Sequence, residues 1–168
     1  MSRLEVLQNC PAQRKTLLAA LGAIEPVNSN HLLFSLENFK MRLSHQLAFQ
    51  INTSICGKNT HRSVLDEGAS TSIMSLSCWR AIYSPEVRQS PTTLKAFDGR
   101  GFQPYGLIPS LAIMLGRKTV SIHVEIIDAT LDYNIVLGRN WFYGMTVVAS
   151  SVFRTVQFPH QGKTITIN

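Results

Sequence analysis

Cysteine is scarce in this sequence, acidic residues are few, and no long apolar run is present. The three cysteines among 168 residues, Cys10, Cys56 and Cys78, stand far apart. An odd number of widely spaced cysteines indicates neither a disulfide framework nor a zinc ribbon, so we expect reduced thiols. No stretch approaches the roughly twenty apolar residues that span a bilayer, and the N-terminus lacks a secretory apolar segment. These absences favour a cytoplasmic protein without a membrane partner.

Metal-binding and nucleic-acid-binding patterns are also missing. The five histidines are too dispersed to show a ligand spacing. Lysine and arginine outnumber the acids by 16 to 10, and the resulting net charge of +6 would suit a phosphate backbone. However, the basic residues are scattered singly apart from Arg14-Lys15 and Arg117-Lys118, and no aromatic residues interleave with them. We therefore expect no metal, no cofactor and no direct contact with nucleic acid.

The chain changes character near residue 45. Leucines recur at helical intervals between Pro11 and Ile24, and residues 28–30 read as a linker. Beyond the change, the sequence is long enough and apolar enough, at 45% hydrophobic residues overall, to form one core of ordinary size. We divide it into a partly helical or disordered N-terminal leader, residues 1–45, and one folded domain, residues 46–168.

The folded part has the pattern of an all-β protein. Apolar residues recur at about every second position and β-forming residue types dominate, which predicts mainly antiparallel strands. Glycines between the strands supply the positive φ of tight hairpins. Two short helices are expected, over Leu76–Ile82 and directly after Gly138. The predicted strands cover residues 48–55, 61–65, 71–74, 93–97, 109–115, 119–127, 134–137, 146–148, 154–158 and 164–167. Together they predict a small closed barrel.

One carboxylate stands at the end of an apolar, β-branched run, just before a glycine turn. This is Asp66, in the stretch Val64–Ser70. Gly68 removes the side chain where the backbone must pass closely or take a positive φ, and Ala69 and Ser70 keep the loop small. Taken alone, Asp66 fits a solvated or turn-capping acid as well as it fits a functional one. Its small neighbours favour an acid that is presented to a ligand.

A second apolar strand, Ile135-Val136-Leu137, ends downstream in Gly138-Arg139. This pair of elements, in this order, resembles the retropepsin family, the aspartic proteases of retroviruses and retrotransposons. Asp66-Glu67-Gly68-Ala69 is similar to the Asp-Thr/Ser-Gly-Ala signature of that family. The downstream strand is similar to its second element, two apolar residues followed by glycine. The stretch from Thr93 to Phe158 is similar to proteases of plant gypsy-like retrotransposon polyproteins.

The resemblance implies a retropepsin-like barrel and an aspartic endopeptidase, with Asp66 as the catalytic residue. The remainder of the active-site loop would be Glu67, Gly68, Ala69 and Ser70. A flap that binds substrate would be formed by Phe97, Asp98, Gly99, Arg100, Gly101 and Phe102, a segment that is otherwise a plain surface hairpin. Structural support next to the site would come from Ile135, Val136, Leu137, Gly138 and Arg139, of which the apolar three also suit an ordinary core.

Peptide hydrolysis by such a site needs two carboxylates about 3 Å apart that share one proton. The chain has one suitable acid, since Asp98, Asp128 and Asp132 do not repeat the Asp-x-Gly-Ala pattern. An isologous dimer places identical residues opposite each other. We therefore expect a homodimer that cleaves a polypeptide, the retrotransposon polyprotein, in the cytoplasm or within virus-like particles.

Two positions depart from the family pattern. Glu67 replaces a Ser or Thr whose hydroxyl bonds across the dimer, and an ionised glutamate cannot donate a hydrogen bond. Ser70 stands where the family has an acid that pairs with the arginine matching Arg139. Two alternatives therefore stay open. One is a degenerate, inactive copy that acts at most as a β-rich dimerisation module, and the other is a β-rich adaptor without enzymatic ancestry.

Overall fold

The computed structural model describes residues 44–96 and 98–168. The predicted leader helix between Pro11 and Ile24 lies outside these residues, and so does Phe97 of the predicted flap. Both stay predictions, as does the domain boundary near residue 45. In the part of the chain that the structure describes, no helix combines the length and apolar character that crossing a bilayer requires.

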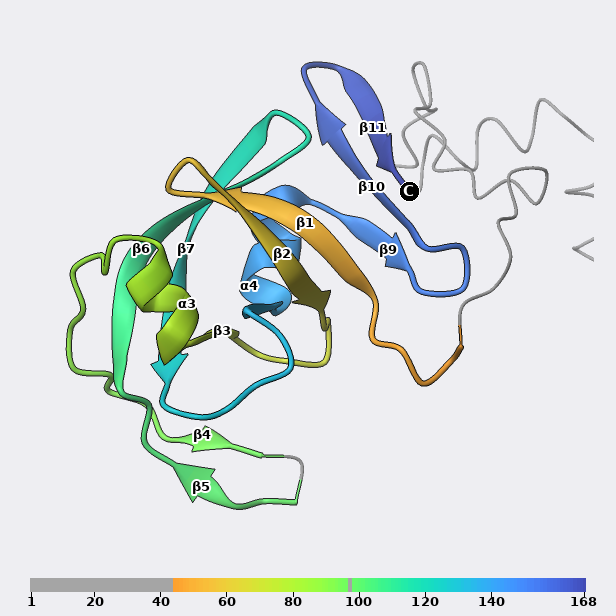
Figure 1. Cartoon of the computed structure of the whole chain (residues 1–168). Coiled ribbons are helices and arrows are strands. Elements are labelled where there is room, and N and C mark those ends of the chain that lie inside the picture. Colours follow the sequence, from red (N-terminus) through yellow and green to blue (C-terminus); the bar gives the residue numbers. More distant parts are fainter. Residues whose placement is uncertain (1–43, 97) are drawn as a thin grey trace, which may run out of the picture. The chain divides into compact units, whose positions relative to one another are not determined.

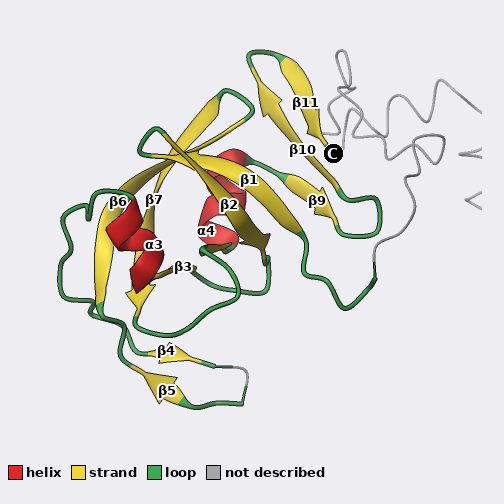
Figure 2. Ribbon diagram, in the orientation of Figure 1, coloured by secondary structure: helices red, strands yellow, loops and turns green. Residues whose placement is uncertain are grey.

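The described residues form eleven strands and two short helices (Figures 1 and 2). The strands are β1 (Gln50–Ile55), β2 (Lys58–Leu65), β3 (Ser72–Ser75), β4 (Leu94–Lys95), β5 (Gly101–Phe102), β6 (Gly106–Leu115), β7 (Lys118–Ile127), β8 (Ile135–Leu137), β9 (Val148–Ser150), β10 (Thr155–His160) and β11 (Lys163–Ile167). The helices are α3 (Leu76–Ala81) and α4 (Arg139–Met145). This mostly β composition confirms the predicted fold class.

Six of the strands close into a barrel in the order β1-β2-β8-β3-β7-β6. The predicted closed barrel is thus confirmed. Beside it, β9, β10 and β11 form a three-stranded antiparallel sheet, and β4 and β5 form a two-stranded hairpin. In Figure 1 the β4–β5 hairpin projects from the end of the barrel near β3.

The barrel is less purely antiparallel than the sequence predicts. Strand β8 lies between β2 and β3, running parallel to β2 and antiparallel to β3. Strand β3 in turn runs parallel to β7. Periodicity reports which residues are β-forming but carries no information on the direction of a distant partner, so these pairings escaped prediction.

Most strand ends differ from the prediction by one to three residues, and the short strand β5 was not predicted. Two of these differences have a local reason. Strand β6 begins at Gly106 instead of Pro109, because its register shifts between Ile108 and Leu111 and so accommodates a proline that cannot donate a ladder hydrogen bond. Strand β9 begins after Thr146, which has φ of 53° and ends helix α4.

The core is built by alternation along the long strands. In β6, Leu111, Ile113 and Leu115 are buried, whereas the intervening side chains are exposed. Helix α4 adds Trp141 and Met145, both completely buried. Burial of such side chains contributes about 1.5–3 kcal/mol each, so α4 is fixed firmly against the barrel. The residue that precedes α4 is Gly138, and its position is fixed with the helix.

The two cysteines in the described residues should react very differently. Cys56 is exposed in the β1–β2 turn, whereas burial raises the pKa of the Cys78 thiol to about 11. We expect iodoacetamide at pH 8 to alkylate Cys56 and spare Cys78 in the folded protein, since the thiolate is the reactive form. Mass spectrometry of a Cys10→Ser variant measures this, and urea should make both thiols react. Equal labelling of both thiols without urea would contradict the burial of Cys78.

The same shift predicts a pH dependence of stability. The folded-state pKa of Cys78 lies above the ordinary value of 9.0, so the unfolded chain loses this proton first as pH rises. The free energy of unfolding should therefore fall between about pH 9 and pH 11 and be unaffected by this group at lower pH.

Candidate active site

Asp66 lies directly after β2, on a tight turn whose hydrogen bonds fix its orientation. Its N–H donates to the carbonyl of Leu137 at 3.1 Å, which joins the ends of β2 and β8. The carboxylate oxygen Oδ1 accepts from the N–H of Gly68 at 2.9 Å, and the Asp66 carbonyl accepts from the N–H of Ala69 at 3.1 Å. The side chain is exposed. The turn therefore holds a carboxylate in one orientation at the surface.

Gly68 serves this turn by leaving space. A Cβ atom built at this residue would lie 3.1 Å from Oδ1 of Asp66, closer than nearly all real contacts of this kind. Gly68 is not among the glycines with positive φ. Of the two reasons that the sequence offers for a glycine here, close approach is therefore the one that applies.

Gly138 packs directly under the Asp66 loop. A Cβ atom at Gly138 would lie 2.3 Å from the carbonyl oxygen of Thr71 and 2.9 Å from that of Ala69. The φ of Gly138 is −89°, so the glycine is required for space and not for its backbone conformation. Its N–H donates to Ser72 Oγ at 3.0 Å, and the next N–H, of Arg139, donates to the Ala69 carbonyl at 2.8 Å. The end of β8 thus forms the support of the loop.

Ser72 and Asn140 extend this support, although they are 68 positions apart in the chain. The Ser72 hydroxyl donates to Asn140 Oδ1 at 2.7 Å, and Asn140 Nδ2 donates to the carbonyl of His123 at 2.8 Å. These bonds connect β3, β7 and α4 beneath the site. The sequence analysis missed both residues. The available signal was a polar residue directly after Gly138-Arg139, at the start of a helix.

The remaining predicted support residues divide into core and surface. Ile135, Val136 and Leu137 are buried and belong to the barrel core. Arg139 is exposed, and so is Ser70. Neither of the two ion pairs formed by the described residues includes Arg139. The arginine–acid pair of the retropepsin pattern has thus no counterpart in this part of the chain.

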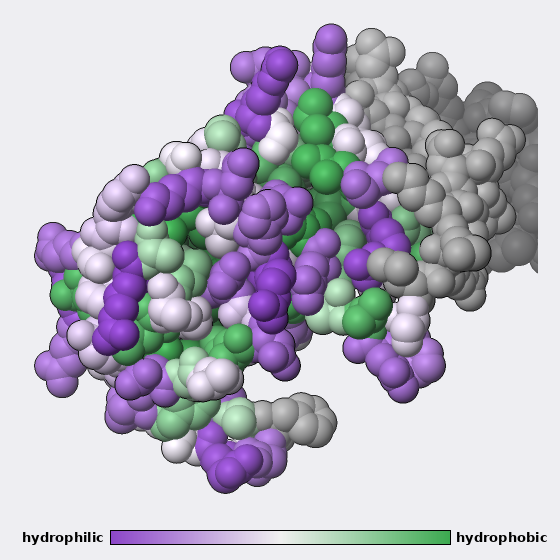
Figure 3. All heavy atoms as spheres, in the orientation of Figure 1, coloured by the Kyte–Doolittle hydropathy of each residue, from purple (hydrophilic) through white to green (hydrophobic). Residues whose placement is uncertain are grey.

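The predicted flap is a short, exposed hairpin. Leu94 of β4 pairs with Phe102 of β5, and Lys95 pairs with Gly101. At its tip Gly99 has φ of 83°, and Asp98 Oδ2 accepts from Arg100 Nε at 2.5 Å. Figure 3 shows the hairpin standing out from the barrel, with the surface hollowed beside it.

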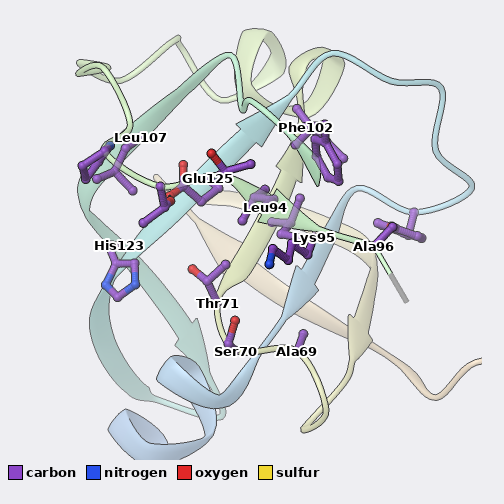
Figure 4. A pocket seen from close by; sticks show the side chains of 16 residues that line it. Ala69, Ser70, Thr71, Leu94, Lys95, Ala96, Phe102, Leu107, His123 and Glu125 are labelled. Atoms are coloured by element: carbon purple, nitrogen blue, oxygen red, sulfur yellow. The ribbon is translucent and has the colours of Figure 1, made fainter. Parts of the chain in front are cut away.

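A cavity of about 710 Å³ separates this hairpin from the Asp66 loop (Figure 4). Its volume falls within the range of ligand-binding pockets. Most of the residues that line it come from the loop, the hairpin, the segment before the hairpin and β7, and β3 and β6 add Ile73 and Leu107. They include Ala69, Ser70 and Thr71 from the loop, Leu94, Lys95, Ala96 and Phe102 from the hairpin, and His123 and Glu125 from β7.

Tyr133 connects Asp66 with this cavity. The tyrosine lines the cavity. Burial raises the pKa of its phenol, and the negative charge of Asp66 raises it further. Tyr133 thus lies within electrostatic range of Asp66, and Ala69 and Ser70 of the Asp66 turn line the same cavity. The sequence carries no signal that distinguishes Tyr133 from any other loop tyrosine.

Metal-ligating side chains do not gather at this site. Over residues 44–96 and 98–168, no three histidine, cysteine, aspartate or glutamate side chains lie close enough to hold a metal ion. The chemistry available to the described residues is that of a carboxylate with a neighbouring phenol.

Comparison with known proteins gives structural neighbours only. No protein-family model matches the sequence, and no curated protein does either. The retroviral protease-like domain of Ddi1 from Leishmania major superimposes with a TM-score of 0.53 at 13% identity, over 70% of this chain and 93% of that one. The EIAV protease, solved in complex with the inhibitor HBY-793, gives a TM-score of 0.50 at 14% identity, over 61% and 92%. At these identities the likeness concerns the fold, and the fold of this chain is retropepsin-like.

Proposed function

We propose that this chain is an aspartic endopeptidase that works as a homodimer, with one Asp66 from each copy. The observation that carries the proposal is the Asp66 turn. The Gly68 amide binds an exposed carboxylate, Gly138 packs under the same turn, and Ala69 and Ser70 of that turn line a cavity that a hairpin borders. Because one chain offers one such acid, a two-fold axis would supply the second.

In the proposed mechanism the two Asp66 carboxyl groups share one proton. The ionised carboxylate removes a proton from a water molecule, which attacks the carbonyl carbon of the substrate peptide bond. The protonated carboxyl group donates its proton to the carbonyl oxygen. The resulting tetrahedral intermediate collapses as one carboxyl group protonates the departing amine and the other carboxylate takes a proton from a hydroxyl of the intermediate, which restores the single shared proton. No covalent bond forms between enzyme and substrate.

An extended polypeptide is the proposed substrate. The hairpin of β4 and β5 and the loop after Asp66 border the cavity from different elements, and a strand-like peptide between them would pair its backbone with the hairpin. From the resemblance in the sequence we further propose that the natural substrate is a retrotransposon polyprotein of the plant gypsy-like type. Its processing would take place in the cytoplasm or in virus-like particles.

The dependence of activity on concentration tests this proposal. If two chains build one site, cleavage of an unfolded protein per chain should rise with chain concentration and then level off. Sedimentation at the same concentrations should show the dimer fraction rising in parallel. A constant activity per chain, in a sample that sediments as a monomer throughout, would overturn the proposal.

The glutamate at position 67 favours a second candidate function, that of an inactive dimerisation module. Its exposed side chain directly follows Asp66, so two further carboxylates would lie near the proposed axis. Like charges at short distance repel, and an ionised glutamate cannot replace a donating hydroxyl. A chain that dimerises but cleaves no unfolded protein at any concentration would establish this candidate instead.

A further inference from the structure

A buried carboxylate beside the cavity has half of its hydrogen-bonding capacity unused. Glu125 of β7 is only 3% exposed. Its Oε1 accepts from Ser90 Oγ at 2.9 Å and from Thr92 Oγ1 at 2.8 Å. Its Oε2 is buried and has no hydrogen-bond partner among the described residues. An unpaired, buried acceptor on a charged group is costly, so this oxygen requires an explanation.

A second unsatisfied oxygen belongs to the same cavity. Thr71 follows the Asp66 loop, and its Oγ1 is also buried without a hydrogen-bond partner in the described part of the chain. Both Thr71 and Glu125 line the cavity, and Figure 4 shows them on the wall that β7 and the loop form. A carboxylate oxygen and a hydroxyl oxygen without partners at one cavity can both accept hydrogen bonds from a group that donates them there.

The basic side chains among residues 44–96 and 98–168 do not fill this role. Lys95 and His123 line the cavity, but both are exposed, and neither ion pair of the described residues includes Glu125. Glu125 is the one carboxylate among the residues that line the cavity. Its negative charge is therefore available to a cation from outside the chain.

From these observations we infer that Glu125 is a specificity-determining residue that selects a lysine or arginine side chain of the bound polypeptide. The aliphatic stem would lie along the apolar lining residues Leu94, Phe102 and Leu107. The charged head would donate to Oε2 of Glu125 and to the Thr71 hydroxyl. A small movement of the loop that carries Ser90 and Thr92 would admit it, since both oxygens are covered in the free chain.

This inference rests on the proposed function, because a substrate must lie in the cavity. In a homodimer each copy contributes one cavity, and the two are related by the two-fold axis. A basic residue would then be preferred at one position on each side of the cleaved bond.

Binding of matched, non-cleavable peptides tests the inference separately from catalysis. Extended peptides with a reduced central bond would carry either lysine or norleucine, its uncharged counterpart, at each position in turn. At one position on each side of the central bond, the wild-type protein should bind the lysine peptide about tenfold to a hundredfold more tightly than the norleucine peptide. This is the difference expected of a buried charge-assisted hydrogen bond.

Glu125→Gln should bring this ratio close to one, because the amide keeps an acceptor for Ser90 and Thr92 but loses the charge. Thr71→Val removes the hydroxyl that is the second proposed acceptor, so it should lower the preference for lysine only in part. Glu86→Gln removes an exposed carboxylate that does not line the cavity, so as the matched control it should preserve the ratio. Thermal unfolding of each variant would show that the fold is intact.

Two results would overturn the inference. They are an absence of lysine preference in the wild-type protein and an unchanged ratio in Glu125→Gln, whether or not that variant weakens both peptides equally. Cleavage of unfolded protein is followed in parallel. Lysine preference without cleavage would refute the protease and leave the specificity of the cavity standing, whereas cleavage without lysine preference would do the reverse.

Discussion

Asp66→Asn should reduce cleavage of an unfolded protein by about a hundredfold to ten-thousandfold, the contribution of a positioned acid or base in catalysis. Asparagine has nearly the shape of aspartate, and its Oδ1 can still accept from the Gly68 N–H. It cannot hold the shared proton or activate water. The loss should therefore appear in turnover while the fold and the dimer persist.

Initial rates of peptide release, measured by mass spectrometry at equal chain concentrations, check this prediction. Glu86→Gln is a suitable control, because Glu86 is an exposed carboxylate that, among the residues the structure describes, pairs only with the neighbouring Arg88. The control should cleave at the wild-type rate. Equal cleavage by the Asp66→Asn variant would show that Asp66 is not the catalytic residue.

Gly138→Ala should be the most damaging substitution for stability. The added Cβ would lie 2.3 Å from the Thr71 carbonyl oxygen, and the backbone on both sides is held by hydrogen bonds and by the buried Trp141. Relief requires that the Asp66 loop separate from β8. We expect a loss of about 3 kcal/mol or more in the free energy of unfolding, at the upper end of overpacking effects.

Urea unfolding followed by tryptophan fluorescence measures this loss. Gly144→Ala provides the control in helix α4, which directly follows Gly138. An alanine Cβ at residue 144 would meet nothing closer than Val120 Cβ at 3.5 Å. Alanine also favours a helix over glycine by about 1 kcal/mol, so this control should be neutral or stabilising. Stabilities of Gly138→Ala and wild type within about 1 kcal/mol of each other would disprove the close packing of loop and strand.

Much of the barrel was predictable because its signals are local. Alternation of apolar residues located the long strands, and the helix expected over Leu76–Ile82 agrees with α3. The glycines at the hairpins between β1 and β2, β6 and β7, and β10 and β11 have positive φ as expected, as Gly57, Gly116 and Gly162 show. Each of these features depends on neighbouring residues alone.

The candidate site was predictable only where a motif covers it. The Asp66 turn and the strand before Gly138 were identified by their resemblance to retropepsins, and their packing against each other followed from the structure. Ser72 and Asn140 escaped because their hydrogen bond joins distant positions. Glu125 escaped because it sits in the apolar run of β7, where a single polar residue on a strand suggests an exposed face, although this side chain is buried.

The central claim is that two chains share one catalytic pair, and mixing wild-type chains with Asp66→Asn chains tests it most directly. Total chain concentration is kept constant, above the level at which sedimentation shows dimers, and the chains are left to exchange. If mixed dimers are inactive, cleavage should follow the square of the wild-type fraction, falling to about one quarter in an equal mixture. A fall in simple proportion, to about one half, would mean that each chain acts alone and would contradict the account.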